Sequence, residues 1–140
     1  MNLTKEKCVI VVDEAMELGN LANVVSILSI SLGKLRPDIV GEDTEDADQK
    51  LHGGLVQVPV PVLKAGAEKI DELRNKLFEE GFEDVSCVDF TDVAQKCMIY
   101  EGYTNTMKAT SGKDFIYYGI ALAGNKKKIN KLTGSLALLR

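Results

Sequence analysis

Asp89 and His52 are the residues of this 140-residue chain whose side chains could perform acid–base chemistry. Asp89 ends an apolar, β-rich run and stands just before Thr91, which opens the next segment. His52 is the only histidine, and it follows a stretch crowded with carboxylates. A carboxylate that orients water and an imidazole that takes up a proton are standard partners in hydrolysis. We take both as candidate catalytic residues, while a structural role as a strand-end cap explains Asp89 equally well and a hydrogen-bonded loop histidine explains His52 better.

A ligand site is expected at the end of the first strand. The turn Met16–Asn20 connects an apolar strand to a helix, and a helix that starts there presents free N–H groups to an anion. Ligands of open α/β sheets bind at the carboxyl ends of strands. We therefore expect Asn20, Thr91 and the segment at Asp89 to converge on one cleft, and we predict that Asn20 caps the helix.

The chain is predicted to hold no metal and to need no cofactor. Asp43, Asp46 and Asp48 do not follow the calcium-loop pattern, and one histidine beside loop carboxylates is a weak zinc set. The three cysteines are far apart, which excludes a disulfide framework and a Cys-x-x-Cys pair. Cys8 and Cys87 fall within predicted strands and are expected to be core residues. We expect a reduced, cytoplasmic protein.

Strands and helices alternate along the chain. The patterns predict strands over 7–12, 39–40, 55–63, 85–90, 115–123 and 136–139. They predict helices over 20–33, 67–80, 91–109 and 125–132, the third with a break at Gly102. Residues 38–54, which include the acidic stretch 42–48, are expected to form a long surface loop. This order predicts one α/β domain over 1–140, a three-layer α/β/α sandwich with a mixed, mostly parallel sheet.

The charge is divided unevenly along the chain. Residues 1–101 hold 10 basic and 20 acidic side chains, and residues 102–140 hold 7 and 1, so the balances are −10 and +6. The basic part could meet phosphates or an acidic partner, or be a solvated surface at Lys126–Lys128. Nucleic acid is a less favoured partner, because the first 101 residues are acidic. No signal peptide and no membrane span are expected.

Both ends of the chain resemble class II peptidyl-tRNA hydrolases. The matching segments are Lys7–Val12 with Met16–Gly19, and Ile129–Leu138. A closer resemblance is to the bacterial group called domain of unknown function 2000, carried by Leu18-Gly19, Ala22-Asn23, His52 before a Pro-Val-Pro-Val stretch, and Tyr118–Ala121. That group is thought to share the hydrolase fold. The resemblance implies a peptidyl-tRNA hydrolase II-like sandwich, Asn23 as a ligand-binding residue, and a scaffold that often forms homodimers.

The chain departs from the hydrolases at positions that matter for chemistry. Asn20 stands where they carry a lysine, and the first helix holds neither glutamine nor histidine. The resemblance therefore assigns the missing cation to Lys113 or the Lys126–Lys128 cluster. Two hypotheses remain. The first is a binding domain for a small anionic or nucleotide-like ligand, held in the strand-end cleft near Asn20, His52 and Asp89. The second is a hydrolase acting on an RNA-linked or small ester substrate, with Asp89 orienting water.

Overall fold

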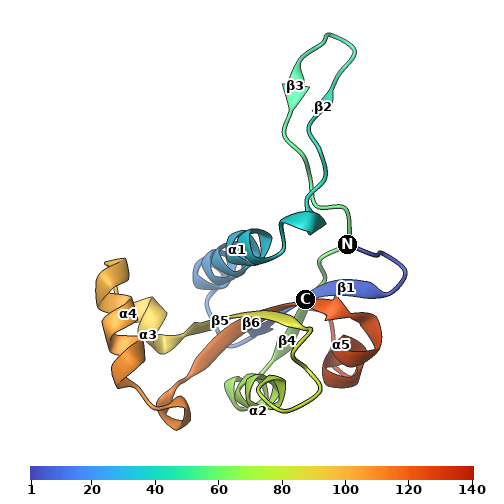
Figure 1. Cartoon of the computed structure of the whole chain (residues 1–140). Helices are drawn as coiled ribbons and strands as arrows, with labels where there is room; N and C mark the ends of the chain where they lie inside the picture. The colour runs from blue at the N-terminus through green and yellow to red at the C-terminus, as the bar shows by residue number, and fades with distance from the viewer.

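A four-stranded mixed sheet forms the centre of the computed structural model, which describes all of residues 1–140 (Figure 1). Its strands are β1 (Glu6–Asp13), β4 (Val62–Ala65), β5 (Ser86–Thr91) and β6 (Tyr117–Asn125), in the order β4-β1-β6-β5. β1 pairs in parallel with β4, whereas β6 is antiparallel to both of its neighbours. The continuous apolar run of β1 is buried from Cys8 to Val12, as predicted for a strand covered on both faces.

The prediction of a mostly parallel sheet is wrong, since only one of its three strand pairs is parallel. The helices between β5 and β6 are α3 (Asp92–Lys96) and α4 (Tyr100–Ala109). They stand beyond the end of the sheet and do not cross its face (Figure 1). The chain therefore re-enters the sheet at the end where it left, which makes β6 antiparallel to β5. A helix between two strands predicts a parallel pair only when that helix covers the sheet.

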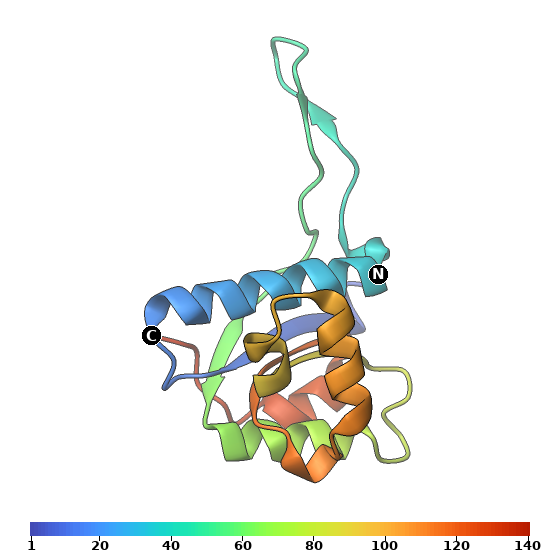
Figure 2. The same ribbon diagram turned by 90° about the vertical axis from the view of Figure 1, so that its left-hand side faces the viewer.

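Helices cover both faces of the sheet (Figures 1 and 2). α1 (Leu18–Leu35) lies on one face, and α2 (Ala67–Leu77) and α5 (Lys126–Thr133) lie on the other. Each side has its own hydrophobic core, built around Leu28 of α1 and around Ile70 of α2. The amphipathic pattern of α2 predicts that Ile70, Leu73, Leu77 and Phe78 face inward. The first three are buried as predicted, whereas Phe78, just after the end of the helix, is 69% exposed.

Several predicted elements differ from the structure. The helix predicted over 91–109 is two helices, broken at residues 97–99 and not at Gly102. The strand predicted over 55–63 is shortened to β4, which starts after Pro59 and Pro61, since proline lacks the ladder donor. The strand predicted over 39–40 is the 3₁₀ helix η1 (Pro37–Ile39). The last predicted strand is reduced to a bridge from Leu138 to Leu63, which covers the outer edge of β4.

The predicted surface loop is a hairpin that projects from the molecule on the side of α1 (Figures 1 and 2). It contains β2 (Thr44–Glu45) and β3 (Leu51–His52), and we call residues 41–55 the arm. At its tip, the Asp46 carboxylate accepts from the backbone N–H groups of Asp48 and Lys50. At its root, a Cβ on Gly54 would lie 1.8 Å from the Gly41 carbonyl oxygen, so the two arm segments need glycine there.

Arg36 ties the end of α1 to the rest of the fold, and this makes stability sensitive to acid. Its guanidinium donates to Asp38 at 2.7 and 2.8 Å and to Glu6 at 3.2 Å. The hydrogen bonds from Arg36 hold the pKa of Asp38 well below its usual 3.8. A carboxyl whose pKa is lowered by folding contributes stability above its unfolded pKa, and this stability is lost as the pH falls through the folded value.

We therefore expect the unfolding temperature to fall steadily as the pH drops from about 5 to 2. Asp38→Asn should be less stable at neutral pH and should lose less on acidification, so that the two curves converge at low pH. Circular dichroism melts at closely spaced pH values measure this. Parallel curves for the two proteins would show that Asp38 does not carry the acid dependence.

Candidate functional site

A polar cleft lies between the N-terminal half of α1 and helix α3. It consists of two adjoining cavities of about 350 and 360 Å³, which share Asn20 and Gln95. We call it the α1–α3 cleft. Its walls are formed by Asp13, Ala15, Met16, Glu17, Asn20, Asn23, Val24, Ile27, Phe90, Ala94, Gln95 and Tyr118. Lysine, arginine, histidine and cysteine are absent from these walls, so the cleft offers amides, carboxylates and apolar surface.

The sheet explains why these residues meet. β1 and β5 are both antiparallel to β6, so their carboxyl ends, at Asp13 and Thr91, lie at the same end of the sheet. Four residues separate the end of β1 at Asp13 from the start of α1 at Leu18, and α3 starts directly after Thr91. A cleft therefore lies at this end of the sheet, and Asn20 and Asn23 line it together.

The N-terminus of α1 is open at this cleft. Glu17 stands at the cap position and its side chain forms no capping hydrogen bond. The first backbone bond of the helix runs from Leu21 N–H to the Glu17 carbonyl, so the preceding N–H groups have no partner in the chain. Asn20 lies inside the first turn, so the prediction that it caps the helix is wrong. Uncapped N–H groups beside amide side chains can bind an acceptor on a ligand.

Thr91 and Lys113 do not line this cleft. Thr91 is 1% exposed, and its hydroxyl points to the Met107 sulfur at 3.9 Å. It also makes no side-chain bond to α3, contrary to the predicted cap. Lys113 lies in the 3₁₀ helix η2 (Gly112–Asp114) and is exposed. The cation that the sequence suggested for the site is therefore not among the groups that surround Asn20.

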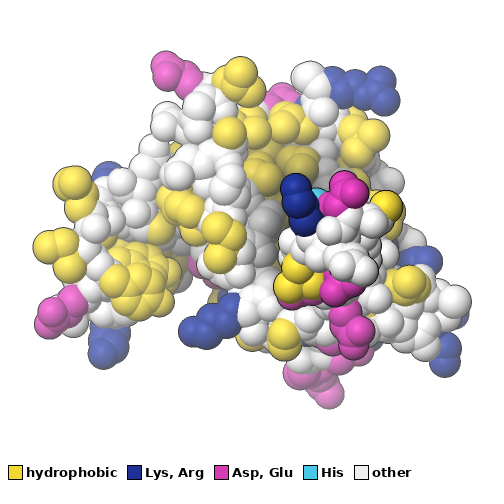
Figure 3. All heavy atoms as spheres, turned by 90° about the horizontal axis from the view of Figure 1, so that it is seen from above, with side chains coloured by type: hydrophobic (Ala, Val, Ile, Leu, Met, Phe, Trp, Pro, Cys, Tyr) yellow, Lys and Arg dark blue, Asp and Glu magenta, His cyan; other side chains and the backbone are white.

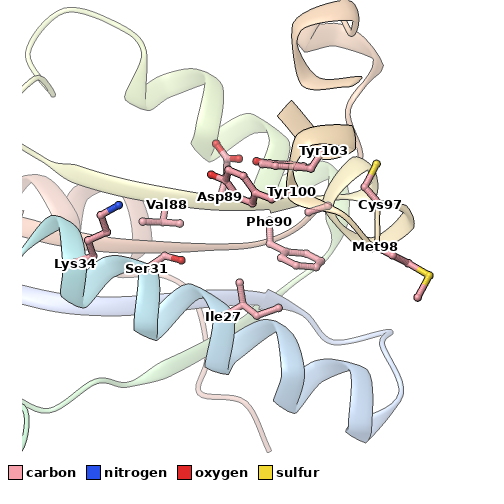
Figure 4. Close-up of a pocket in the computed structure, with 11 residues that line it drawn as sticks. Ile27, Ser31, Lys34, Val88, Asp89, Phe90, Cys97, Met98, Tyr100 and Tyr103 are labelled. Carbon is pink, nitrogen blue, oxygen red and sulfur yellow. The ribbon is translucent and has the colours of Figure 1, made fainter. Parts of the chain in front are cut away.

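Asp89 lines a neighbouring groove of about 530 Å³ that follows the free edge of β5 (Figure 4). Its carboxylate accepts from Nε of Arg74 at 2.8 Å, with side chains that are 18% and 15% exposed. In Figure 4, Asp89 and Tyr103 lie on one side of β5, and Phe90 and Ile27 lie on the other. Burial, and next the charge of Asp89, raise the pKa of Tyr103. Asp89 is thus held in an ion pair on the α2 side of the strand.

His52 lies on the arm, outside both the α1–α3 cleft and the groove beside β5 (Figure 1). Its Nε2 contacts the Asp46 carboxylate at 2.8 Å, and its side chain is 59% exposed. The hydrogen bond from His52 lowers the pKa of Asp46. The structure therefore brings Asn20 and Asn23 together, places Asp89 in the adjoining groove, and leaves His52 apart from all three.

Comparison with known proteins identifies the family. Residues 6–140 match the family described as protein of unknown function, DUF2000. The chain belongs to the DUF2000 family. The protein of unknown function Atu0240 from Agrobacterium tumefaciens strain C58 has a similar structure, with a TM-score of 0.85 at 16% sequence identity. The similarity covers 96% of this chain and 97% of that one, and at this identity it shows a shared fold alone. No curated protein matches.

The Cys8 and Cys87 thiols of this DUF2000 protein are poor nucleophiles. Burial raises the pKa of Cys87 to about 12 and also raises that of Cys8, so both stay protonated at neutral pH. Cys97 lines the groove of Asp89, and its thiol donates to the Thr106 hydroxyl at 3.9 Å. No group of three or more His, Cys, Asp or Glu is arranged to hold a metal ion.

Sequence reasoning missed Gln95, Tyr118 and Arg74. Gln95 lies on the first turn of the helix after β5, and the strand-end rule that selected Asn20 could also have found it. Tyr118 lines the cleft from the start of β6, whose reversed direction was not predicted. Nothing in the sequence marked Arg74 as a partner of Asp89, because an arginine on an amphipathic helix is usually solvated.

Proposed function

We propose that this DUF2000 protein is a binding domain that takes a small nucleoside- or nucleotide-like ligand in the α1–α3 cleft. The observation that carries the proposal is that amides from two helices, Asn20 and Asn23 of α1 and Gln95 of α3, converge beside the uncapped N-terminus of α1. Each amide offers two donors and an acceptor, which suits a heterocycle that carries both.

The chemistry of the walls favours a ligand with a base over a free phosphate. Phe90 and Ile27 provide an apolar wall for a flat ring. Asp13 and Glu17 oppose a bare anion, and the cleft holds no cation to offset them. A phosphate, where the ligand has one, would be stabilised by the free N–H groups at the start of α1.

Titration calorimetry with the common ribonucleosides and their monophosphates tests the proposal. Asn23→Ala should weaken binding about fivefold, because a lost hydrogen bond costs about 1 kcal/mol. Asn75→Ala is the matched control, since Asn75 is exposed on α2, on the opposite face of the sheet. His52→Ala should also bind normally. Equal losses in Asn23→Ala and Asn75→Ala, or no binding across the panel, would contradict the proposal.

The hydrolase hypothesis, with Asp89 orienting water, has weaker support. The Asp89 carboxylate is already engaged by Arg74, and it lies on the other side of β5 from the amides of the cleft. We also propose that the chain has the three-layer, peptidyl-tRNA hydrolase II-like fold. The strand order β4-β1-β6-β5, with α1 opposite α2 and α5, supports this, and superposition on a solved class II hydrolase tests it.

A further inference from the structure

The central sheet has two edges, and the chain covers only one of them. At β4, Lys64 donates its backbone N–H to the Ala137 carbonyl, and Leu139 donates its N–H to the Val62 carbonyl. The C-terminal segment therefore lies along that edge. β5 is the strand at the other edge, and no segment of the chain pairs with its outer side. β5 also lacks the proline and lysine with which proteins commonly protect an exposed edge.

The hydrogen-bond register shows which backbone groups of β5 point outward. Ile10 of β1 donates its N–H toward β4, so it directs its backbone groups away from β6. Its partner on β6, Ala121, must then bond to β5, where it lies opposite Val88. The residues on either side of Val88, which are Cys87 and Asp89, point their N–H and C=O groups to the free edge. These groups form no hydrogen bond with another part of the chain.

The groove that contains Asp89 lies along this free edge and is walled on both sides (Figure 4). α1 forms one wall, and α4 with the residues just before it forms the other. The wall residues are Ile27, Ser31 and Lys34 of α1, and Met98, Tyr100 and Tyr103. Met98 and Tyr100 are 99% and 76% exposed. Seen from the side of the arm, hydrophobic side chains gather over α1 and at the α3–α4 end of the molecule (Figure 3).

The groove has one charge without a partner. The Asp89 carboxylate is neutralised by Arg74, whereas Lys34 forms no ion pair. In Figure 4, Lys34 lies beside Val88, at the end of the groove away from Met98. The groove therefore offers backbone donors and acceptors along its floor, apolar surface on its walls and a single cation at one end.

We propose that the free edge of β5 binds an extended peptide segment of a partner protein, which adds to the sheet as a fifth strand. The peptide backbone pairs with Cys87 and Asp89, and this pairing supplies the N–H and C=O partners that the edge lacks. Alternate side chains of the peptide contact α1 on one face and Tyr103 on the other. An acidic residue of the peptide meets Lys34.

The length of the edge limits the length of the peptide. The ladder of β5 is regular from Ser86 to Phe90 and shifts its register between Phe90 and Thr91. Five residues at roughly 3.3 Å each give a paired segment of roughly 16 Å. The groove shares Ile27 and Phe90 with the α1–α3 cleft, but the peptide uses the backbone of β5 and not the amides of that cleft.

Amide hydrogen exchange of the protein, followed residue by residue with nuclear magnetic resonance, tests whether the edge is free. The N–H groups of Cys87 and Asp89 should exchange at least about tenfold faster than those of Val88 and Phe90, which bond to β6. Equal exchange at these four residues would overturn the proposal. Exchange at Cys87 and Asp89 that slows as the protein is concentrated would assign the edge to a second copy, and this too would overturn it.

The peptide is found by selection from random seven-residue sequences displayed on phage, and its affinity is measured by fluorescence anisotropy. Selected peptides should alternate apolar residues and carry Asp or Glu. N-methylation of successive peptide amides should weaken binding at least about fivefold at every second position and little between them, because only alternate N–H groups face β5. Bound peptide should slow exchange at Cys87 and Asp89. An even N-methylation profile, or no selected peptide, would contradict strand addition.

Lys34→Glu tests the charge at the end of the groove. It should weaken binding of the selected acidic peptide at least about fivefold, and the loss should shrink as salt is added. Lys76→Glu is the matched control, since Lys76 is likewise exposed in the last turn of a helix, but on α2 at the opposite face of the sheet. Equal effects of the two variants would contradict the assignment of Lys34. Circular dichroism of both variants separates loss of binding from loss of the fold.

Discussion

Replacing Gly119 with valine is expected to lower the free energy of unfolding by about 3 kcal/mol. Gly119 lies on β6 and faces α1, with no room for a side chain. A Cβ there would lie 2.9 Å from Cδ1 of Leu28, and 3.2 Å from both Cγ1 of Val24 and the carbonyl oxygen of Val11. Leu28 and Val24 are 0% and 2% exposed, so they cannot swing into solvent. A larger side chain has to push α1 away from the sheet.

Urea denaturation followed by circular dichroism measures this cost. Gly119→Ala should lose less than Gly119→Val, because it adds one atom in place of three. Gly102→Val on α4 is the control, since nothing lies within 4 Å of a Cβ there, and it should change stability by less than about 1 kcal/mol. If Gly119→Val and Gly102→Val had equal effects, the close packing of α1 on β6 would be disproved.

The sequence predicted the central layers of the fold because burial leaves a pattern. A continuous apolar run marked β1, and helical spacing marked the inner side of α2. The direction of a strand leaves no such pattern, so the antiparallel β6 could not be seen. The sequence predicted a surface loop at the arm but missed its hairpin pairing, since the two short strands are exposed and have no apolar alternation.

The sequence located one part of the candidate site, the turn at Asn20, but misplaced Asp89 relative to it. The rule that ligands bind at strand ends located Asn20 and the turn before α1. Alternation along a strand places neighbouring side chains on opposite faces. Because Phe90 packs with the core beneath α1, Asp89 had to face α2, away from Asn20. The sequence could therefore have predicted the side of β5 on which Asp89 lies, had Phe90 been taken as a core residue.

The second large effect is expected at the Asp89–Arg74 pair. Asp89→Ala should cost about 2–3 kcal/mol of unfolding free energy, because it leaves a guanidinium that is 15% exposed without its partner. Arg74→Met should cost a similar amount by leaving the carboxylate unpaired, and it also removes the contact of Arg74 with the Phe78 ring at 4.0 Å. The double variant should be more stable than the sum of the two losses predicts, by about 1–2 kcal/mol.

The double-mutant cycle, together with the variant Asp89→Asn, decides whether Asp89 is structural or catalytic. A structural ion pair predicts strong coupling in the double-mutant cycle and no peptidyl-tRNA or small-ester hydrolysis by the wild-type protein. A carboxylate that orients water predicts hydrolysis that disappears in Asp89→Asn while the unfolding transition stays close to wild type. Turnover that is lost in Asp89→Asn and retained in Asn23→Ala would move the functional site from the α1–α3 cleft to the groove beside β5. Coupling without turnover leaves the cleft as the site, with Asp89 supporting β5 from the opposite face of the sheet.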